Sequence, residues 1–230
     1  MVHQPPWSGG ERRPLYSPLL EAAARLAAQG HHGHFRKGDA ADRCSEAAAE
    51  APLPSGCVPY ITHLMGTMGI LARVGAPDSV LAAALLHDYL EDVPDPDGPA
   101  TIRAAVGDEV LRLVLEVTEE KRPELDSSET WPVRKNEQIQ KMAGNSEGAV
   151  MIKTADLLHN ALSLLVDLDS AGDQESVWLR LNAGPDRQLW YFSSGLDAAR
   201  RRLGSHRLVD ELEQAIGRLR GRVESLGSSR

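Results

Sequence analysis

The sequence predicts a single all-α domain, and its length, composition and residue patterning all point to this class. The chain has 230 residues, of which 42% are hydrophobic and only 4% are aromatic. Alanine and leucine are abundant, and no glycine-punctuated pattern of short strands recurs, so helices are favoured over sheet. A domain of this length buries roughly 70% of its unfolded surface. It therefore needs neither a disulfide framework nor a structural metal to fold.

The helices of the N-terminal half can be placed from the residues that start and stop them. Residues 1–16 are polar and contain paired prolines and glycines, so we expect a flexible tail. Ser17 and Pro18 provide an N-cap followed by proline at the first helical position. Residues 38–58 lack a steady apolar period and predict an inserted irregular loop. The helices expected in this half cover residues 18–30, 61–74, 79–92, 101–105 and 108–118.

The C-terminal half is also expected to be helical, after a charged, proline-containing surface linker at residues 119–129. Gly184 and Pro185 should interrupt one long helical segment. We expect the main domain to cover residues 17–204 and a last helix within 205–230 to pack on it. The apolar C-terminal residues favour such packing and also allow a homo-oligomer contact. The helices expected in this half cover residues 131–142, 148–168, 174–203 and 205–226.

Charge and composition exclude several classes of function. The formal net charge is −8, which argues against a general nucleic-acid partner or an anionic membrane surface, because both attract a basic face. We read no apolar run of the ~18 residues that a membrane span requires, and the N-terminus lacks the apolar segment of a signal peptide. Cys44 and Cys57 are expected to be free thiols of a cytoplasmic protein. A small polyanionic substrate stays possible if a cation offsets its charge.

Acidic residues end the predicted helix 79–92. Its apolar stripe, at spacings of three and four, continues into carboxylates as the helix closes. Carboxylates this close repel one another and oppose the helix dipole unless a cation lies among them. The alternative is a solvated acidic helix end. The residues concerned are His87, Asp88, Glu91 and Asp92.

A narrow polar stripe runs along the otherwise apolar helix predicted at 148–168. A surface helix has a wide polar face, so a narrow stripe indicates a helix that is buried on most sides. Either the stripe faces an internal site, with Asp156 as a metal ligand, or it is a buried polar network that organises packing. The stripe consists of Lys153, Asp156, Asn160 and Ser163.

Two further segments carry groups that could complete a site. His63 lies at the start of the helix 61–74, and with His87, Asp88 and Asp156 it would give two imidazoles and two carboxylates. This mixed set suits Mn, Fe, Zn or Co better than Mg or Ca. Arg36 can stack on a base or bind phosphate with two donors, and the adjacent lysine offers a point charge. A solvated basic turn is the alternative for that pair.

Four segments, in this order, resemble the (p)ppGpp hydrolase domain of RelA/SpoT-type proteins, which are HD-domain metal phosphohydrolases. A histidine–aspartate dyad alone is a weak signal, but four motifs in the family's order make chance agreement improbable. Residues 38–58 separate the first two motifs, which usually lie a few residues apart in the family. The segments are Arg36-Lys37 (RK), Pro59 to His63 (PYIxH), Leu85 to Asp92 (LLHDxxED) and Lys153 to Asn160 (KxADxLHN).

The resemblance implies an HD-domain helical bundle that removes the 3′-pyrophosphate from guanosine tetra- or pentaphosphate. The chain has no room for the synthetase and regulatory domains of the long enzymes, so it resembles the stand-alone small alarmone hydrolases. Glu91 and Asp92 would serve the attacking water. The family's single Mn²⁺ ion would be held by His63, His87, Asp88 and Asp156.

The resemblance also implies a substrate side for this site. Arg36 and Lys37 would lie against the guanine and nearby phosphate, Asn160 would contact the nucleoside, and Lys153 is a further candidate for substrate binding. Three other functions fit the same residues. The scaffold could act on another nucleotide, such as an adenosine alarmone or NADPH, it could bind a nucleotide without turnover, or it could be a structural protein with a buried polar network.

Overall fold

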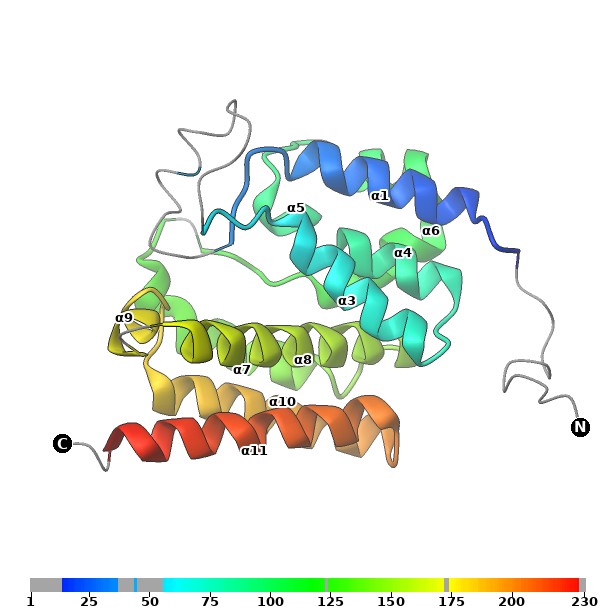
Figure 1. Ribbon diagram of the computed structural model, residues 1–230. Helices are drawn as coiled ribbons and strands as arrows, with labels where there is room; N and C mark the ends of the chain where they lie inside the picture. The colour runs from blue at the N-terminus through cyan, green and yellow to red at the C-terminus, as the bar shows by residue number, and fades with distance from the viewer. Residues whose placement is uncertain (1–13, 37–43, 45–55, 123, 172–173, 228–230) are drawn as a thin grey trace, which may run out of the picture.

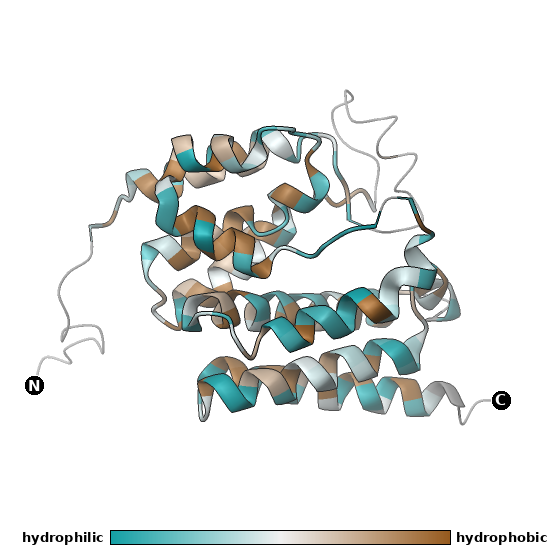
Figure 2. Ribbon diagram, turned by 180° about the vertical axis from the view of Figure 1, so that it is seen from behind, coloured by the Kyte–Doolittle hydropathy of each residue, from teal (hydrophilic) through white to brown (hydrophobic). Residues whose placement is uncertain are grey.

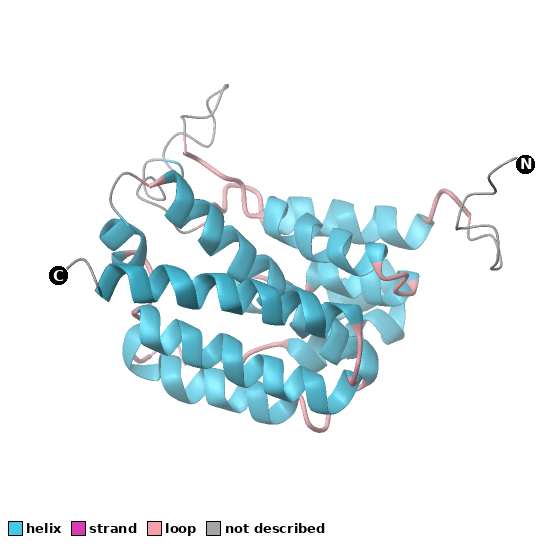
Figure 3. Ribbon diagram, turned by 60° about the horizontal axis from the view of Figure 1, so that its bottom comes forward, coloured by secondary structure: helices cyan, strands magenta, loops and turns pink. Residues whose placement is uncertain are grey.

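The computed structural model describes residues 14–36, 44, 56–122, 124–171 and 174–227, and throughout these residues the chain forms helices and loops (Figure 3). The predictions of an all-α class and a single domain are confirmed. Most of the predicted tail and of the predicted inserted loop lies outside the described residues, and so does Lys37. The helices are α1 (Pro18–Gly30), α3 (Ile61–Arg73), α4 (Asp78–Leu86), α5 (Tyr89–Asp92), α6 (Gly98–Val117), α7 (Ser127–Lys141), α8 (Glu147–Ser170), α9 (Gln174–Leu179), α10 (Pro185–Leu203) and α11 (Arg207–Gly227).

Local sequence signals account for several of the helix starts. The Ser17 hydroxyl accepts a hydrogen bond from the backbone N–H of Leu20, and Pro18 follows it as the first residue of α1. Ser146 caps α8 by accepting from the N–H of Ala149, and Asp126 caps α7. Each cap satisfies backbone donors that the first turn of a helix leaves without a partner.

The helices form two layers on either side of α8 (Figure 1). One hydrophobic core lies among α1, α3, α4, α6 and the first half of α8. A second core lies among α7, α10, α11 and the rest of α8. Seen from behind, α10 and α11 alternate hydrophobic and hydrophilic residues, as amphipathic helices do when one side is covered (Figure 2). The last helix therefore packs on the bundle, against α8 and α10.

Helix α8 is the shared element of both cores, as its apolar sequence predicts. It is long and apolar enough to cross a membrane by length and composition, with a mean hydropathy of 1.3 over its most apolar window. However, 67% of that window is buried inside the fold. We therefore interpret α8 as a core helix.

The predicted helix 79–92 is interrupted, so the expectation of one continuous helix was wrong. Helix α4 ends at Leu86, and α5 begins at Tyr89. The Nδ1 atom of His87 donates to the carbonyl of Ala84 at 2.7 Å, the oxygen that the N–H of Asp88 would use in a continuous helix. Asp88 then has φ −99° and ψ 1°, outside the helical range. The break turns the dyad toward α8.

The inserted segment leaves and re-enters the fold at one place. An isolated antiparallel bridge joins Phe35 to Pro59, with Arg36 N donating to Val58 O at 2.9 Å and Tyr60 N donating to His34 O at 2.8 Å. These two bonds bring the RK and PYIxH segments side by side despite their separation in sequence.

The two cysteines form a disulfide, so the expectation of free thiols was wrong. Cys44 and Cys57 have Cα atoms 5.5 Å apart, a separation at which a disulfide can form. Cys57 lies two residues before the bridged Pro59, so the returning chain places it where Cys44 can reach it. Two cysteines are too few for a framework of several disulfides, but they are enough for this single bond, which joins residues 13 apart in sequence.

Candidate metal centre

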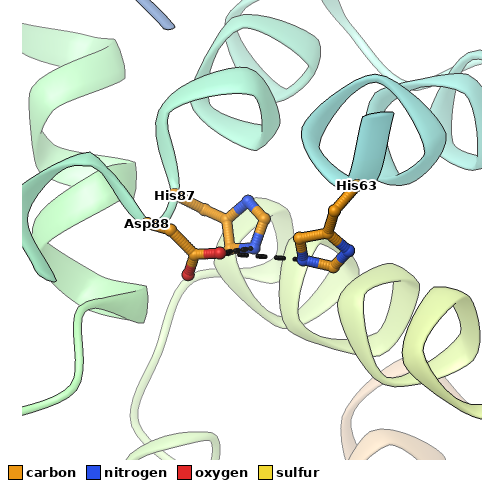
Figure 4. A group of neighbouring side chains, drawn as sticks. All are labelled: His63, His87 and Asp88. Atoms are coloured by element: carbon orange, nitrogen blue, oxygen red, sulfur yellow. Dashed lines mark ion pairs between the residues drawn. The ribbon is translucent and has the colours of Figure 1, made fainter. Parts of the chain in front are cut away.

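Three helical segments bring together the four residues that the sequence predicts as metal ligands. His63 lies in the first turn of α3, His87 and Asp88 occupy the break between α4 and α5, and Asp156 lies midway along α8. Figure 4 shows the side chains of His63, His87 and Asp88 gathered together, with the His87 ring between the Asp88 carboxylate and the His63 imidazole. Segments far apart in sequence thus present two imidazoles and two carboxylates to one point.

The ligand atoms of His63, His87 and Asp88 all lie within 4.8 Å of one another, and Asp156 approaches both imidazoles. His63 Nε2 lies 3.3 Å from Asp156 Oδ1 and 3.7 Å from Asp88 Oδ2. His87 Nε2 lies 3.2 Å from Asp88 Oδ2 and 3.8 Å from Asp156 Oδ1. Ligand atoms placed about 2.1 Å from one metal are roughly 3.0–3.4 Å apart. The group can therefore close on a single cation with small side-chain movements.

One buried atom in this group has no partner within the described part of the chain. His87 Nε2 is buried and makes no hydrogen bond. The same ring donates its Nδ1 proton to Ala84 O, which leaves a lone pair on Nε2 in the neutral ring. An orphaned lone pair facing two carboxylates and a second imidazole is what a divalent metal requires, so these residues fit such an ion.

Without a metal, the four groups strongly perturb one another. Burial alone would lower the pKa of His87, but Asp88 and Asp156 outweigh it and raise that pKa to about 9. Burial would raise the pKa of Asp88, yet His87 and His63 hold it well below its usual range. The pKa of Asp156 is also held low against burial, chiefly by Lys153 and His63. Both carboxylates are therefore ionised and available to a cation.

A second layer of hydrogen bonds orients the carboxylates. The Tyr60 hydroxyl donates to Asp88 Oδ2 at 2.6 Å. Asp156 accepts from Lys153 Nζ at Oδ2, at 2.8 Å, and from Asn160 Nδ2 at Oδ1, at 2.6 Å. Lys153, Asp156 and Asn160 of the polar stripe on α8 thus form one connected network centred on Asp156. Lys153 neutralises part of its charge.

Glu91 and Asp92 occupy different surroundings although they are neighbours. Glu91 Oε1 accepts the backbone N–H of Glu119 at 2.7 Å. Burial, reinforced by the charge of Asp88, raises the pKa of Glu91 to about 7. Asp92 is more exposed and pairs with Lys121. Of the two, Glu91 is the carboxylate that can exchange a proton near neutral pH.

Arg36 reaches the edge of this centre, while its predicted partner Lys37 lies outside the described residues. Arg36 Nη2 donates to Asn160 Oδ1 at 2.9 Å, and its guanidinium carbon lies 5.8 Å from the centre of the Tyr60 ring. Through Asn160 it is connected to Asp156. The insertion between the two motifs therefore does not displace Arg36 from the site.

Three residues of the site were not singled out from the sequence. Tyr60 and His159 lie inside the PYIxH and KxADxLHN segments, but no role was assigned to them. His159 is three residues after Asp156, a spacing that places both on one helix face, so a signal was present. Glu119, which supplies the N–H for Glu91, comes from the segment interpreted as a surface linker and is 4% exposed.

A helical bundle that brings a histidine–aspartate dyad together with a histidine and an aspartate from neighbouring helices has the features of a metal-binding helical domain. The family model described as the HD domain matches residues 40–181, which is more than half of the chain. The chain therefore belongs to the HD-domain family.

Relatives and solved structures agree with this membership. The chain is similar to the human guanosine-3′,5′-bis(diphosphate) 3′-pyrophosphohydrolase MESH1, with 39% identity over 149 residues, covering 64% of this chain and 69% of that protein. For the mouse protein of the same name, identity is 39% over 48% of this chain and 58% of that protein, so the chain spans less than two thirds of that relative. A structure titled "A metazoan ortholog of SpoT hydrolyzes ppGpp and plays a role in starvation responses" aligns with TM-score 0.66 and 27% identity, over 91% of this chain and 99% of the other. A Listeria monocytogenes EGD-e protein aligns with TM-score 0.57 and 30% identity, over 67% and 96%.

Proposed function

We propose that this protein is a metal-dependent hydrolase that removes the 3′-pyrophosphate from guanosine tetra- or pentaphosphate. The observation that carries the proposal is the convergence of four donor atoms, with side-chain distances of 3.2 to 3.8 Å, next to a carboxyl group whose pKa is near 7. The names of the MESH1 relatives support the choice of substrate. The ligands in this proposal are His63, His87, Asp88 and Asp156.

The reaction breaks the bond between phosphorus and the ribose 3′-oxygen, and water supplies the new oxygen on phosphorus. A bound divalent ion supplies Lewis acidity toward a phosphoryl oxygen and lowers the pKa of a water molecule. Glu91 accepts the proton of the attacking water and then gives this proton to the departing ribose oxygen, either directly or through the neighbouring Asp92. The N–H of Glu119 keeps the Glu91 carboxylate oriented for this transfer.

A protein of net charge −8 can bind this polyanion because basic side chains lie next to the candidate metal centre. Arg36 lies at the edge of the centre, where its planar guanidinium can stack on guanine or bind phosphate. Its present partner, Asn160 Oδ1, is an acceptor that the nucleoside can replace with its own polar groups. We assign Arg36, Lys37, Lys153 and Asn160 to the substrate side.

Three further assignments go beyond membership of the HD-domain family: the metal ion, the location in the cell and the oligomeric state. We propose Mn²⁺ as the ion, because the resemblance to the (p)ppGpp hydrolases implies it and the mixed imidazole and carboxylate set suits Mn as well as Fe, Zn or Co. We propose a cytoplasmic location with a small nucleotide as the partner. In that reducing compartment the Cys44–Cys57 disulfide would open, which alkylation of freshly lysed cells can measure. A homo-oligomer stays a prediction that light scattering can test.

The test is incubation of purified protein with ppGpp and Mn²⁺, followed by separation of GDP and pyrophosphate. We expect the wild type to release GDP and pyrophosphate in equal amounts. Asp88→Ala should lose both metal uptake and hydrolysis. Glu91→Gln should keep the metal, because its amide oxygen still accepts the Glu119 N–H, but lose roughly 10²–10⁴-fold in kcat because it cannot accept a proton.

Three results of the same assay would contradict part or all of the proposal. Full hydrolysis by metal-free Asp88→Ala would reject the metal-dependent mechanism. Turnover of an adenosine alarmone or NADPH in the same assay, with none of ppGpp, would keep the mechanism and replace the substrate. No turnover of any nucleotide, together with no metal in the wild type, would leave a buried polar network that serves packing alone.

A further inference from the structure

His159 contacts one of the four ligands without being a ligand itself. Its Nδ1 atom lies 2.9 Å from Nδ1 of His63, and the two rings meet edge to face at 4.8 Å between centroids. The Ser163 hydroxyl, one turn further along α8, lies 3.4 Å from the same atom of His159. His159 therefore approaches His63 from the side of the ring opposite to Nε2, the atom that faces the carboxylates.

This contact bears on which ring nitrogen of His63 carries the proton. A histidine that gives its Nε2 lone pair to a metal must carry its proton on Nδ1. That Nδ1–H is buried, because His63 is 1% exposed, so it needs an acceptor. The acceptor at hydrogen-bond distance is Nδ1 of His159, which must then carry its own proton on Nε2. For His87, the backbone carbonyl of Ala84 fills the same role.

A glycine on the opposite helix makes room for this ring. Gly66 lies one turn after His63 on α3, and a Cβ atom built there would come 2.2 Å from His159 Nε2 and 2.3 Å from its Cδ2. No side chain larger than hydrogen fits without moving the imidazole. Gly69, on the same helix, is different: a Cβ atom there meets nothing within 4 Å. The glycine at 66 is thus a packing requirement of His159, while the glycine at 69 is not.

From these contacts we propose that His159, seated against Gly66, is a positioning residue that fixes the Nδ1–H tautomer of His63 and so prepares Nε2 to bind the metal. The inference rests on the proposed function in one respect, which is that His63 is a metal ligand. Partners that orient metal-binding histidines typically change metal affinity 10–100-fold when removed. A carbonyl, carboxylate or water usually has this role, and here a second imidazole would replace it.

The first experiment reads the metal affinity, and then the Nδ1 proton of His63 in protein loaded with diamagnetic Zn²⁺. His159→Phe keeps a ring of similar size but offers no acceptor, so the dissociation constant for Mn²⁺ should rise about 10–100-fold. In the Zn²⁺-loaded wild type, proton NMR should show a hydrogen-bonded Nδ1 proton on His63, and this signal should move upfield in His159→Phe. His159→Asn places an amide oxygen near the lost nitrogen and should restore most of the affinity.

The second experiment tests the fit between the two helices with a matched pair of glycine substitutions. Gly66→Ala should weaken Mn²⁺ binding about 10-fold or more, because the new methyl group displaces His159. Gly69→Ala makes the same change in helix propensity on the same helix and should leave the affinity unchanged. When His159 is already alanine, Gly66→Ala should have no further effect on affinity, because nothing remains to be displaced.

The outcomes separate this proposal from the proposed function. Unchanged affinity and an unshifted Nδ1 proton of His63 in His159→Phe would overturn it, as would equal affinities for Gly66→Ala and Gly69→Ala. If His159→Phe does not fold, the glycine pair decides. A wild-type protein that takes up no divalent ion would contradict the proposed function, whereas a wild type that binds the ion and variants that bind it equally well would contradict the role of His159 alone.

Discussion

His31 is a histidine that its surroundings keep neutral. It is 3% exposed and stacks on the Tyr60 ring at 5.1 Å between centroids, with the edge of Tyr89 on another side. Its Nε2 atom is buried and has no partner among the described residues. Burial lowers the pKa of His31 to about 4, against the opposing charges of Asp88 and Asp92. Protonating this ring therefore favours the unfolded chain.

The resulting prediction concerns stability in mild acid. The unfolded state takes up a proton near pH 6.5 and the folded state only near pH 4, so the free energy of unfolding should fall as pH drops between these values, by up to about 3 kcal/mol from this group. Urea unfolding of His31→Gln across this range should show a shallower fall than the wild type. His32→Gln removes an exposed histidine and should keep the wild-type slope. Equal slopes for all three proteins would contradict the burial argument.

For single residues, the sequence predicts which side chains come together better than it predicts the groups that hold them in place. His63, His87, Asp88 and Asp156 were expected together because helical spacing and the resemblance both select residue types with strong chemistry. Partners such as His159, or the N–H of Glu119, depend on how one helix approaches another. The position of Arg36 beside the centre depends on a bridge between distant backbone segments, which no local pattern encodes.

At the scale of single elements, helix ends were predictable and helix interruptions only partly so. Caps and prolines use local rules, and α1, α3 and α8 begin within a residue or so of their predicted starts. The break at His87 was not predicted, because it requires a side chain to take the place of a backbone donor. The predicted division of residues 101–118 into two pieces corresponds to a kink at Gly107, where φ is 85° and ψ is 174°.

Gly107 provides a test of that kink. Its backbone conformation is essentially restricted to glycine, although a Cβ atom there would meet nothing within 4 Å. Gly107→Ala should therefore reduce the free energy of unfolding by about 1–3 kcal/mol through backbone strain alone. Gly217→Ala, in the interior of α11 with the same open surroundings, should instead stabilise by up to about 1 kcal/mol. Chemical denaturation of the two variants measures both, and a neutral Gly107→Ala would show that α6 can straighten.

The whole molecule consists of two hydrophobic cores joined through α8. The upper core lies among α1, α3, α4 and α6, next to the candidate metal centre, and the lower core lies among α7, α10 and α11. Because α8 contributes residues to both, neither core can lose its packing without exposing part of this helix. Composition and periodicity predicted the burial of α8, but which helices share it depends on tertiary contacts that the sequence does not display.

This arrangement predicts one cooperative unfolding transition. Leu212 of α11 is fully buried in the lower core, so Leu212→Ala should cost about 2–5 kcal/mol. Fluorescence of Trp131 and Trp178, both in the lower core, should change at the same denaturant concentration as the far-UV circular dichroism of all helices. Two separated transitions in the variant would show that the cores unfold independently.

The bridge between Phe35 and Pro59 also has a consequence for how this fold tolerates change. Since the backbone departs and returns through adjoining hydrogen bonds, the length between those points is decoupled from the geometry on either side, and lengthening such a connection carries only a slowly growing entropic penalty. Residues can therefore be added to or removed from this connection without moving the backbone segments that the bridge joins. The connection between Phe35 and Pro59 is therefore a suitable site for inserting a reporter peptide.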